Sequence, residues 1–368
     1  MIRPGTPISD LDTPCLLVDL PKMDANIRNW QTAISASGAK LRPHVKTHKV
    51  PEIALRQQRA GAAGITVAKV SEAEVFAAGG CDDIFIAYPI IGVEKWRRAA
   101  ELARTCTLAV GVDSEVGARG LSSAAAAAGT TIRVRVEIDL GMNRSGVPPA
   151  KAEALCRLVM TLPGLELDGL FTFRSVFFAG AEGRTAADLG REEGELMASL
   201  ADRLRVSGFP IREVSLGSTP TARYAAQVPG VTELRPGTYI FGDYMMAEYG
   251  VISYDDVALS ILCTVVSRPA PDKATVDGGS KTFSGDIVPA RLNLKYARAV
   301  GMDAYVESMS EEHGVVRLGP GADPQIGDKV AFYPVHVCTA VNLSDELIGV
   351  CDGKVEQVFP ILARGKRT

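Results

Sequence analysis

Short apolar runs alternate with stretches of helical spacing through the first two thirds of the chain. The apolar runs are rich in Val, Ile and Leu, and they predict strands at 15–20, 40–46, 64–70, 83–90, 107–112, 131–139, 165–173, 213–217 and 232–235. The stretches between them predict helices at 22–37, 71–78, 93–104, 115–128, 149–161 and 186–207, with a further helix beginning at Pro51. Apolar strands in alternation with helices indicate parallel strands that are buried on both faces of a sheet.

The number of these strand–helix units predicts the fold class. About eight units over about 230 residues fit an α/β fold of the (β/α)₈ TIM-barrel type. An open, doubly wound sheet is the alternative architecture. No Gly-x-Gly-x-x-Gly run follows the first strand, which argues against a dinucleotide-binding sheet.

The pattern changes after about residue 249, where helical spacing nearly disappears. Short strands are predicted at 257–267, 273–276, 314–318, 329–334 and 347–350, and Asp352-Gly353-Lys354 is a hairpin-turn signal. We therefore expect three parts. They are an N-terminal segment at 1–20 that packs with the β domain, a barrel at 21–249, and a C-terminal all-β domain at 250–368.

Charge and cysteine usage narrow the class of protein. The chain of 368 residues has a formal net charge of -3 and no long basic run, which argues against nucleic acid as a partner. Seven cysteines occur at wide spacing without a Cys-x-x-Cys pair, which favours reduced thiols and a cytoplasmic location. The chain has no signal-peptide core and no run of about 18 apolar residues, so we expect no membrane association.

The densest group of cations lies at 41–49, Leu-Arg-Pro-His-Val-Lys-Thr-His-Lys, and holds two of the four histidines. On the predicted strand, His44, Lys46 and His48 would share one face. Neighbouring positive charge and burial both disfavour the charged form of a lysine, and a lowered pKa is what a Schiff-base lysine requires. A solvated basic strand end explains most such clusters, so these residues alone leave both interpretations open.

Further polar residues follow the carboxyl ends of other predicted strands, where barrels place their active residues. Asn143 and Arg144 lie on the glycine-bounded loop 139–146, and small or hydroxyl-bearing residues fill the loops at 216–221 and 235–239. Backbone N–H groups of such late loops often bind phosphate. A lysine, an arginine and an anion site at one barrel mouth are what pyridoxal phosphate requires.

The run at 42–49 resembles the lysine motif of the D-threonine aldolase and D-serine dehydratase family. The resemblance covers nearly the whole chain and includes the runs at 12–15, 69–74, 217–220, 235–239 and 311–314. Members are fold-type III pyridoxal-phosphate enzymes with an alanine-racemase-like barrel and a C-terminal β domain. The resemblance implies that Lys46 forms the internal aldimine and that Arg144 approaches the pyridine nitrogen. It also implies a group of residues around the phosphate: Ser218, Thr219, Gly237, Thr238 and Tyr239.

A second resemblance lies at Pro334-Val-His-Val-Cys338. The family carries a divalent metal on a His-x-Cys or His-x-Asp pair. On a predicted strand, His336 and Cys338 would share a face, which is ligand spacing. The cysteine suits zinc, whereas aldolases of the family use manganese or magnesium. The alternative is a buried strand in which Cys338 is a small apolar residue. His313 is read as a turn residue rather than as a neighbour of the metal.

One motif departs from the family pattern. Relatives often carry a Tyr-x-Gly-His-like run where this chain has Phe173-Arg174-Ser175-Val176, so the histidine is absent and the catalytic base is unassigned. We expect Arg174 near the barrel mouth. It would pair either with a substrate carboxylate, as a catalytic-site residue, or with an acid of the barrel rim in a structural ion pair.

These resemblances imply a homodimeric lyase that depends on pyridoxal phosphate and a divalent metal and acts on D-β-hydroxy amino acids. Retro-aldol cleavage of the D-threonine aldolase type is favoured, and elimination of the D-serine or D-threo-3-hydroxyaspartate dehydratase type is the alternative. An amino-acid racemase is a second alternative, disfavoured because a racemase needs no metal. A non-catalytic pyridoxal-phosphate carrier is usually a bare barrel, so residues 250–368 argue against it.

Overall fold

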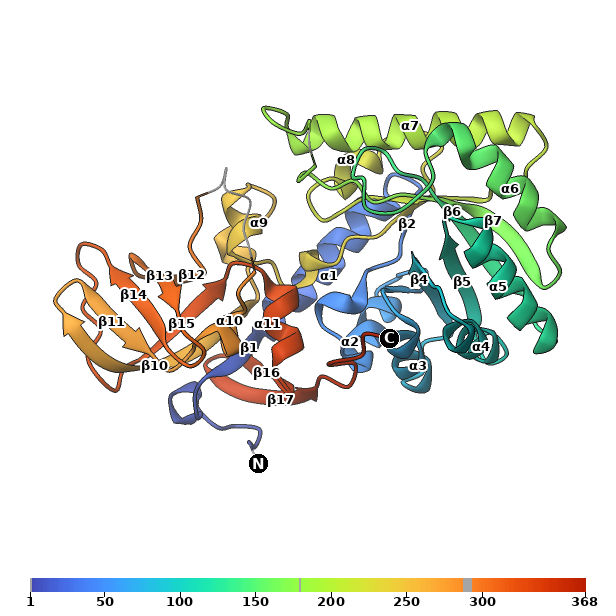
Figure 1. The fold of residues 1–368 in the computed structure, drawn as a ribbon. Coiled ribbons are helices and arrows are strands. Elements are labelled where there is room, and N and C mark those ends of the chain that lie inside the picture. The colour runs from blue at the N-terminus through green and yellow to red at the C-terminus, as the bar shows by residue number, and fades with distance from the viewer. Residues whose placement is uncertain (1, 179, 287–292) are drawn as a thin grey trace. The chain divides into compact units, whose positions relative to one another are not determined.

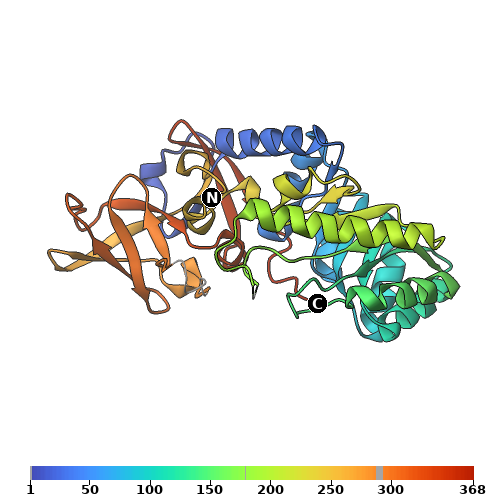
Figure 2. The same cartoon turned by 90° about the horizontal axis from the view of Figure 1, so that it is seen from above.

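The computed structural model describes residues 2–178, 180–286 and 293–368. The chain divides into two compact units, drawn in Figures 1 and 2. The first contains residues 1–28, 47–50 and 238–365, and the second contains residues 29–46, 51–237 and 366–368. None of the helices in the described part of the chain has the length and apolar character of a membrane span.

The second unit is built on a parallel sheet of eight strands. In chain order these are β2 (Lys40–Leu41), β3 (Ile65–Val67), β4 (Asp83–Pro89), β5 (Thr107–Val112), β6 (Ile132–Glu137), β7 (Leu165–Phe171), β8 (Glu213–Leu216) and β9 (Glu233–Leu234). The strands follow one another consecutively from β3 to β9, and β2 pairs with β9. A single parallel bridge between His44 and Thr66 links the two edges. This order is that of a TIM-like sheet, as predicted, and not that of a doubly wound sheet.

Helices alternate with these strands, and the apolar spacing predicts all of them except α8. They are α1 (Leu20–Ser35), α2 (Pro51–Arg59), α3 (Val70–Ala78), α4 (Val93–Leu102), α5 (Glu115–Ala127), α6 (Ala152–Thr161), α7 (Ala186–Val206) and α8 (Ala222–Ala225). Helices α4, α5 and α6 lie along the outside of the sheet (Figure 1), and the long helix α7 packs against α8 (Figure 2). The loops at the carboxyl ends of the strands are thereby left to form the site.

Charged side chains lie buried on one face of this parallel sheet. Glu233 accepts hydrogen bonds from Arg42 Nε at 2.6 Å, from Arg135 Nη1 at 2.5 Å and from Ser215 Oγ at 2.7 Å. Burial alone would raise the pKa of Glu233, but the two arginines hold it below its ordinary range. The Arg135 guanidinium lies 4.5 Å from the centre of the Phe85 ring. Glu233 and the two arginines therefore have charged partners, which buried charges need in order to be tolerated.

The first unit is built on a sheet of nine strands. They are β1 (Cys15–Asp19), β10 (Leu259–Ala270), β11 (Lys273–Val276), β12 (Ala297–Ala299), β13 (Ala304–Met309), β14 (Gly314–Leu318), β15 (Lys329–Pro334), β16 (Glu346–Cys351) and β17 (Lys354–Pro360). Strand β10 pairs with both β11 and β15, so β10 to β15 close into an antiparallel barrel. This unit is roughly all-β, with the short helices α9 (Tyr244–Glu248), α10 (Ser280–Phe283) and α11 (Val337–Leu343).

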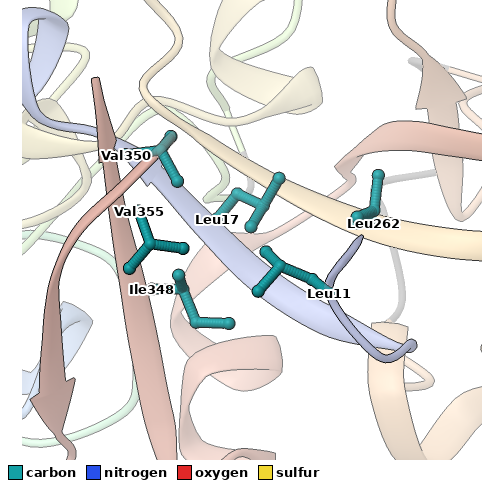
Figure 3. Packing of buried hydrophobic residues seen from close by; sticks show 6 residues of the cluster. All are labelled: Leu11, Leu17, Leu262, Ile348, Val350 and Val355. Atoms are coloured by element: carbon teal, nitrogen blue, oxygen red, sulfur yellow. The ribbon is translucent and has the colours of Figure 1, made fainter. Parts of the chain in front are cut away.

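Strand β1 joins the N-terminal segment to this sheet. It pairs antiparallel with β10 and parallel with β16. Six buried side chains meet around it, as Figure 3 shows: Leu11, Leu17, Leu262, Ile348, Val350 and Val355. Burying a Leu or Val side chain of this kind contributes roughly 1.5–3 kcal/mol, so this cluster holds the first residues of the chain to the β sheet.

Two sequence predictions around the candidate chemistry are wrong in local structure. The strand predicted at 40–46 ends at Leu41, and Val45–Thr47 forms a 3₁₀ turn, so His44, Lys46 and His48 do not lie on one strand face. Pro43 has no N–H to continue a strand ladder. The segment with His336 and Cys338 is not a strand either, because His336 is the N-cap of α11.

Candidate active site

A cavity of about 510 Å³ opens at the carboxyl ends of the parallel strands, and Lys46 lines it. Its wall includes residues that follow or end six strands: His44 and Lys46 after β2, Lys69 after β3, Tyr88 on β4, Asp113 after β5, Glu137 on β6 with Arg144 after it, and Phe173 after β7. Arg235, after β9, lines it as well. The sequence prediction placed its active residues at these strand ends, and this is where barrels of this type carry their sites.

Phe173 lies close to two of the predicted cofactor residues, Lys46 and Arg144. Its ring centre is 5.9 Å from Lys46 Nζ and 4.7 Å from the guanidinium carbon of Arg144. An aromatic face attracts cations at such distances. The structure therefore brings Lys46 and Arg144 together around one ring. A second lysine of the cavity, Lys69, stacks on Tyr88 with its Nζ 3.5 Å from the ring centre.

The loop that carries Arg144 is held at both ends. Asp139 N donates to Val147 O at 2.9 Å, and Val147 N donates to Glu137 O at the same distance. Inside the loop, Asp139 Oδ1 accepts from Asn143 N at 3.1 Å. Gly146 has φ +101, and a Cβ there would lie 2.7 Å from Asp139 N, so this position needs glycine. Arg144 itself is exposed at the cavity rim.

Arg235 is a second arginine in the cavity, which the sequence analysis quoted only as part of a loop. It is buried, and its Nε donates to Ser215 Oγ at 2.9 Å. Its Nη2 donates to the Thr172 carbonyl. Burial lowers the pKa of Arg235 to about 10. The Arg-Pro-Gly run that directly follows β9 is the sequence signal that could have identified it.

The residues predicted around the phosphate fall into both units. Ser218 and Thr219 follow β8, and Gly237 follows the neighbouring strand β9. Ser218 N donates to Thr221 Oγ1 at 3.0 Å, and the two hydroxyls lie 2.9 Å apart. Thr238 and Tyr239 belong to the first unit, in the 3₁₀ turn Thr238–Ile240.

Arg174 makes the ion pair that was one of its two predicted roles. It is buried, its Nη2 pairs with Glu192, and its guanidinium lies 4.2 Å from the centre of the Phe178 ring. Glu192 also accepts from Arg184 Nη1 at 2.8 Å. In this structure Arg174 therefore holds the loop after β7 against α7 and does not line the lysine cavity.

Glu193, which the sequence analysis missed, ties two loops of the site together. The carboxylate accepts from Arg174 N at 3.1 Å and from Thr221 Oγ1 at 3.3 Å. It is fully buried, and burial raises its pKa to about 7. A glutamate in a helix of mixed polarity gives no signal of this contact in the sequence.

Replacing Glu193 with glutamine should change how stability depends on pH. The pKa of Glu193 is about 7 in the folded chain, whereas its ordinary value is 4.5. As the pH rises from 4.5 to about 7, the burial of this carboxyl group therefore destabilises the folded chain by an increasing amount. The amide does not ionise. Between pH 5 and pH 8 the variant should gain about 2–3 kcal/mol in unfolding free energy relative to the wild type. Urea unfolding at both pH values measures this, with the exposed Glu195→Gln as the control, and an equal difference at both pH values would contradict it.

The predicted metal pair lies in the first unit. His336 Nδ1 is 3.1 Å from Asp243 Oδ2, and Val337 N donates to the same oxygen at 3.2 Å. A carboxylate only accepts, so this contact places a proton on Nδ1 and leaves Nε2 for a metal. Cys338 Sγ is 3.2 Å from Thr47 Oγ1. Burial alone would lower the pKa of His336. The nearby Cys338 sulfur and the Asp243 carboxylate nevertheless raise this pKa well above its ordinary value.

Two donors make an incomplete metal site. Among the described residues, no group of three or more His, Cys, Asp or Glu side chains is arranged to hold a metal ion. Catalytic zinc sites usually have three protein ligands. The fully buried Asp243 fits the usual partner of a metal-binding histidine. Within the described residues, His336 and Cys338 therefore offer two donors and no third. His313 lies at the turn between β13 and β14, as predicted, where Ser310 N donates to its carbonyl.

Two family models match the chain in succession. Residues 18–245 match the alanine racemase N-terminal domain, and residues 258–350 match a putative serine dehydratase domain. A D-threonine aldolase from Arthrobacter sp is 37% identical over 372 residues, which cover 99% of this chain and 95% of that protein.

Solved structures give the same relationship. The D-threonine aldolase from Filomicrobium marinum matches with a TM-score of 0.88 and 32% identity, over 100% of this chain and 99% of that one. A metal-free mutant of a D-threo-3-hydroxyaspartate dehydratase matches with a TM-score of 0.86 and 32% identity, over 96% of this chain and 98% of that one.

Proposed function

The chain belongs to the fold-type III pyridoxal-phosphate family that joins an alanine racemase N-terminal domain to a serine dehydratase domain, and on this premise we propose that it is a lyase of D-β-hydroxy amino acids. The proposed reaction is cleavage of the D-threonine aldolase type. The observation that carries the proposal is the cavity at the strand ends, where Lys46 and two arginines converge. Full-length similarity to a D-threonine aldolase supports the substrate class.

The cavity fits pyridoxal phosphate in size and charge. Lys46 would hold the cofactor covalently, and Arg144 or the buried Arg235 would face the pyridine nitrogen. Ser218, Thr219, Gly237, Thr238 and Tyr239 would surround the phosphate, as the family motifs imply. Bound pyridoxal phosphate supplies the electron sink for cleavage at Cα. The residues of the chain hold it in place and exclude water from it.

A divalent metal at His336 and Cys338 is part of the proposal. The His336–Asp243 contact supports it, because it orients the imidazole as metal sites require. The metal-free form of the related dehydratase implies that metal is bound in that protein. Such an ion would supply a Lewis acid for the substrate hydroxyl. Zinc, manganese and magnesium are the candidates, and the Cys338 sulfur favours zinc.

The products formed from D-threonine distinguish the proposed activity from its alternatives. An aldolase releases acetaldehyde and glycine in equal amounts, whereas a dehydratase releases 2-oxobutanoate and ammonia, and a racemase, which inverts Cα alone, forms L-allo-threonine. Chromatography of a reaction with purified enzyme, pyridoxal phosphate and Mn²⁺ should give acetaldehyde and glycine. Formation of 2-oxobutanoate would assign the dehydratase alternative, which the similarity to D-threo-3-hydroxyaspartate dehydratase supports. L-allo-Threonine as the sole product would contradict a lyase.

We further propose that the protein is a cytoplasmic homodimer. None of the seven cysteines forms a disulfide, as is usual for proteins of a reducing compartment. The family resemblance supports the dimer, and two-fold dimers are the commonest oligomers. Light scattering should therefore give about twice the chain mass of 39.0 kDa. A mass equal to that of one chain would contradict the dimer.

A further inference from the structure

One carboxylate in the lysine cavity has an oxygen without a donor. Glu137 is the last residue of β6, and it is 3% exposed. Its Oε1 accepts a hydrogen bond from Ser145 Oγ at 2.8 Å. Its Oε2 is buried and receives no hydrogen bond from the residues that the structure describes. Because Glu137 lines the cavity with Lys46, whatever occupies that cavity can reach it.

An unpaired oxygen of this kind needs an explanation. Leaving a buried acceptor unsatisfied is costly, and such groups are rare in folded chains. The other carboxylate of the cavity, Asp113, differs because its Oδ2 accepts from Gly146 N at 3.2 Å. Glu137 is also fixed on a strand, with Ser145 holding its other oxygen. The fold therefore keeps Oε2 oriented for a donor that the occupant brings.

We propose that Glu137 is the acid–base residue of the lyase and that its Oε2 takes the proton of the substrate β-hydroxyl. This inference rests on the proposed function. It fills the role left open at 173–176, where the run departs from the family pattern and no histidine is present. As the proton leaves, the hydroxyl oxygen forms the aldehyde carbonyl and the Cα–Cβ bond breaks. The electron pair of that bond passes to Cα, and Glu137 then returns its proton to Cα, which completes glycine and regenerates the carboxylate.

The surroundings of Glu137 favour this role. Burial raises its pKa, and Asp113 acts in the same direction, while the Ser145 hydrogen bond, Arg144 and Arg235 oppose the increase. A carboxyl group whose pKa is raised toward neutrality is a stronger general base than an exposed one. The cations also keep its charged form accessible in a buried place.

The test compares Glu137→Gln with the wild type on D-threonine. The amide preserves shape but takes no proton, so kcat should fall by about 10²–10⁴-fold, the contribution typical of general acid–base catalysis. The visible absorbance of the bound cofactor should remain. The decrease of kcat/KM at low pH, which is the acid limb of its pH profile, should disappear. In Glu137→Ala, which leaves space beside Oε2, added formate should restore part of the turnover.

Matched variants separate this role from a structural one. Glu166→Gln removes an exposed carboxylate of β7 that pairs with Arg212 and does not line the cavity, so it should keep both the acid limb and the turnover of the wild type. Glu137→Gln that retains the turnover and the acid limb would overturn the role of Glu137 alone, provided the wild type cleaves D-threonine. Loss of the cofactor absorbance in that variant would also overturn it, because Glu137 would then hold the cofactor. A wild type that cleaves no D-β-hydroxy amino acid would overturn the lyase and this inference together.

Discussion

Lys46→Ala should bind no cofactor covalently, because it lacks the amine that forms the Schiff base. Its turnover of D-threonine should fall by more than about 10⁴-fold, since the groups of a catalytic site depend on one another. The Lys46 amine lines the strand-end cavity, and its distance of 5.9 Å from the Phe173 ring centre places it beside the proposed cofactor position. The measurement is borohydride reduction followed by peptide mapping of the labelled lysine. In the wild type, the label should be on Lys46.

A second lysine makes the control for this prediction. Lys69 lines the same cavity and stacks on Tyr88, so it is the nearest competitor for the cofactor. Lys69→Met should keep the reducible cofactor on Lys46. A reducible adduct that persists in Lys46→Ala, or a label mapped to Lys69, would show that the covalent residue has been misassigned.

His336→Ala and Cys338→Ala should each abolish the metal-dependent turnover while leaving the covalently held cofactor in place. Loss of either donor removes half of the protein's own ligands, so the Lewis acid is lost but Lys46 is not affected. Metal content after dialysis, measured by mass spectrometry, should fall to the level of the chelated protein. Asp243→Asn keeps both donors but loses the carboxylate at 3.1 Å from His336, and it should weaken metal binding by about 10–100-fold.

His313→Ala is the matched control for the metal variants. It removes a histidine from the same unit, at the turn between β13 and β14, where Ser310 is its neighbour. Metal content and turnover should equal those of the wild type. Metal retained in full by both His336→Ala and Cys338→Ala would contradict the proposed site.

The sequence predicts the strands of the parallel sheet well because they are continuous apolar runs. Strand β5, at Thr107–Val112, has the predicted bounds. Most other strands of this sheet are shorter than predicted, since their apolar runs continue into buried loops. In the first unit, β12, β13 and β17 were not predicted. In these segments the alternation of apolar and polar residues is short and is interrupted by further polar residues. They form strands because they pair with distant strands when the barrel closes.

Local structure around the chemistry was harder to predict. Lys46 was placed on a strand because Val45 favours one, but the ladder ends at Leu41 before Pro43. The strand predicted for His336 and Cys338 is a helix start, where the Asp243 carboxylate, distant in sequence, accepts the Val337 N–H. Tertiary contacts of this kind override local propensity.

The buried charges of the site were the least visible in the sequence. Strand β6 reads Ile-Arg-Val-Arg-Val-Glu, an alternation that is typical of a half-exposed strand. In the structure Arg135 and Glu137 are buried, because the polar side of β6 meets other charges such as Glu233. Only the partner residues, which come from remote strands, distinguish this arrangement from a solvated face.

The central claim is that the chain cleaves D-β-hydroxy amino acids with both pyridoxal phosphate and a metal. The most direct measurement follows acetaldehyde release from D-threonine and from L-threonine, before and after treatment with EDTA and after Mn²⁺ or Zn²⁺ is restored. We expect release from the D-isomer only, loss of release with EDTA while the cofactor remains bound, and recovery with metal. Cleavage of L-threonine at the same rate, or full activity in the chelated enzyme, would contradict it.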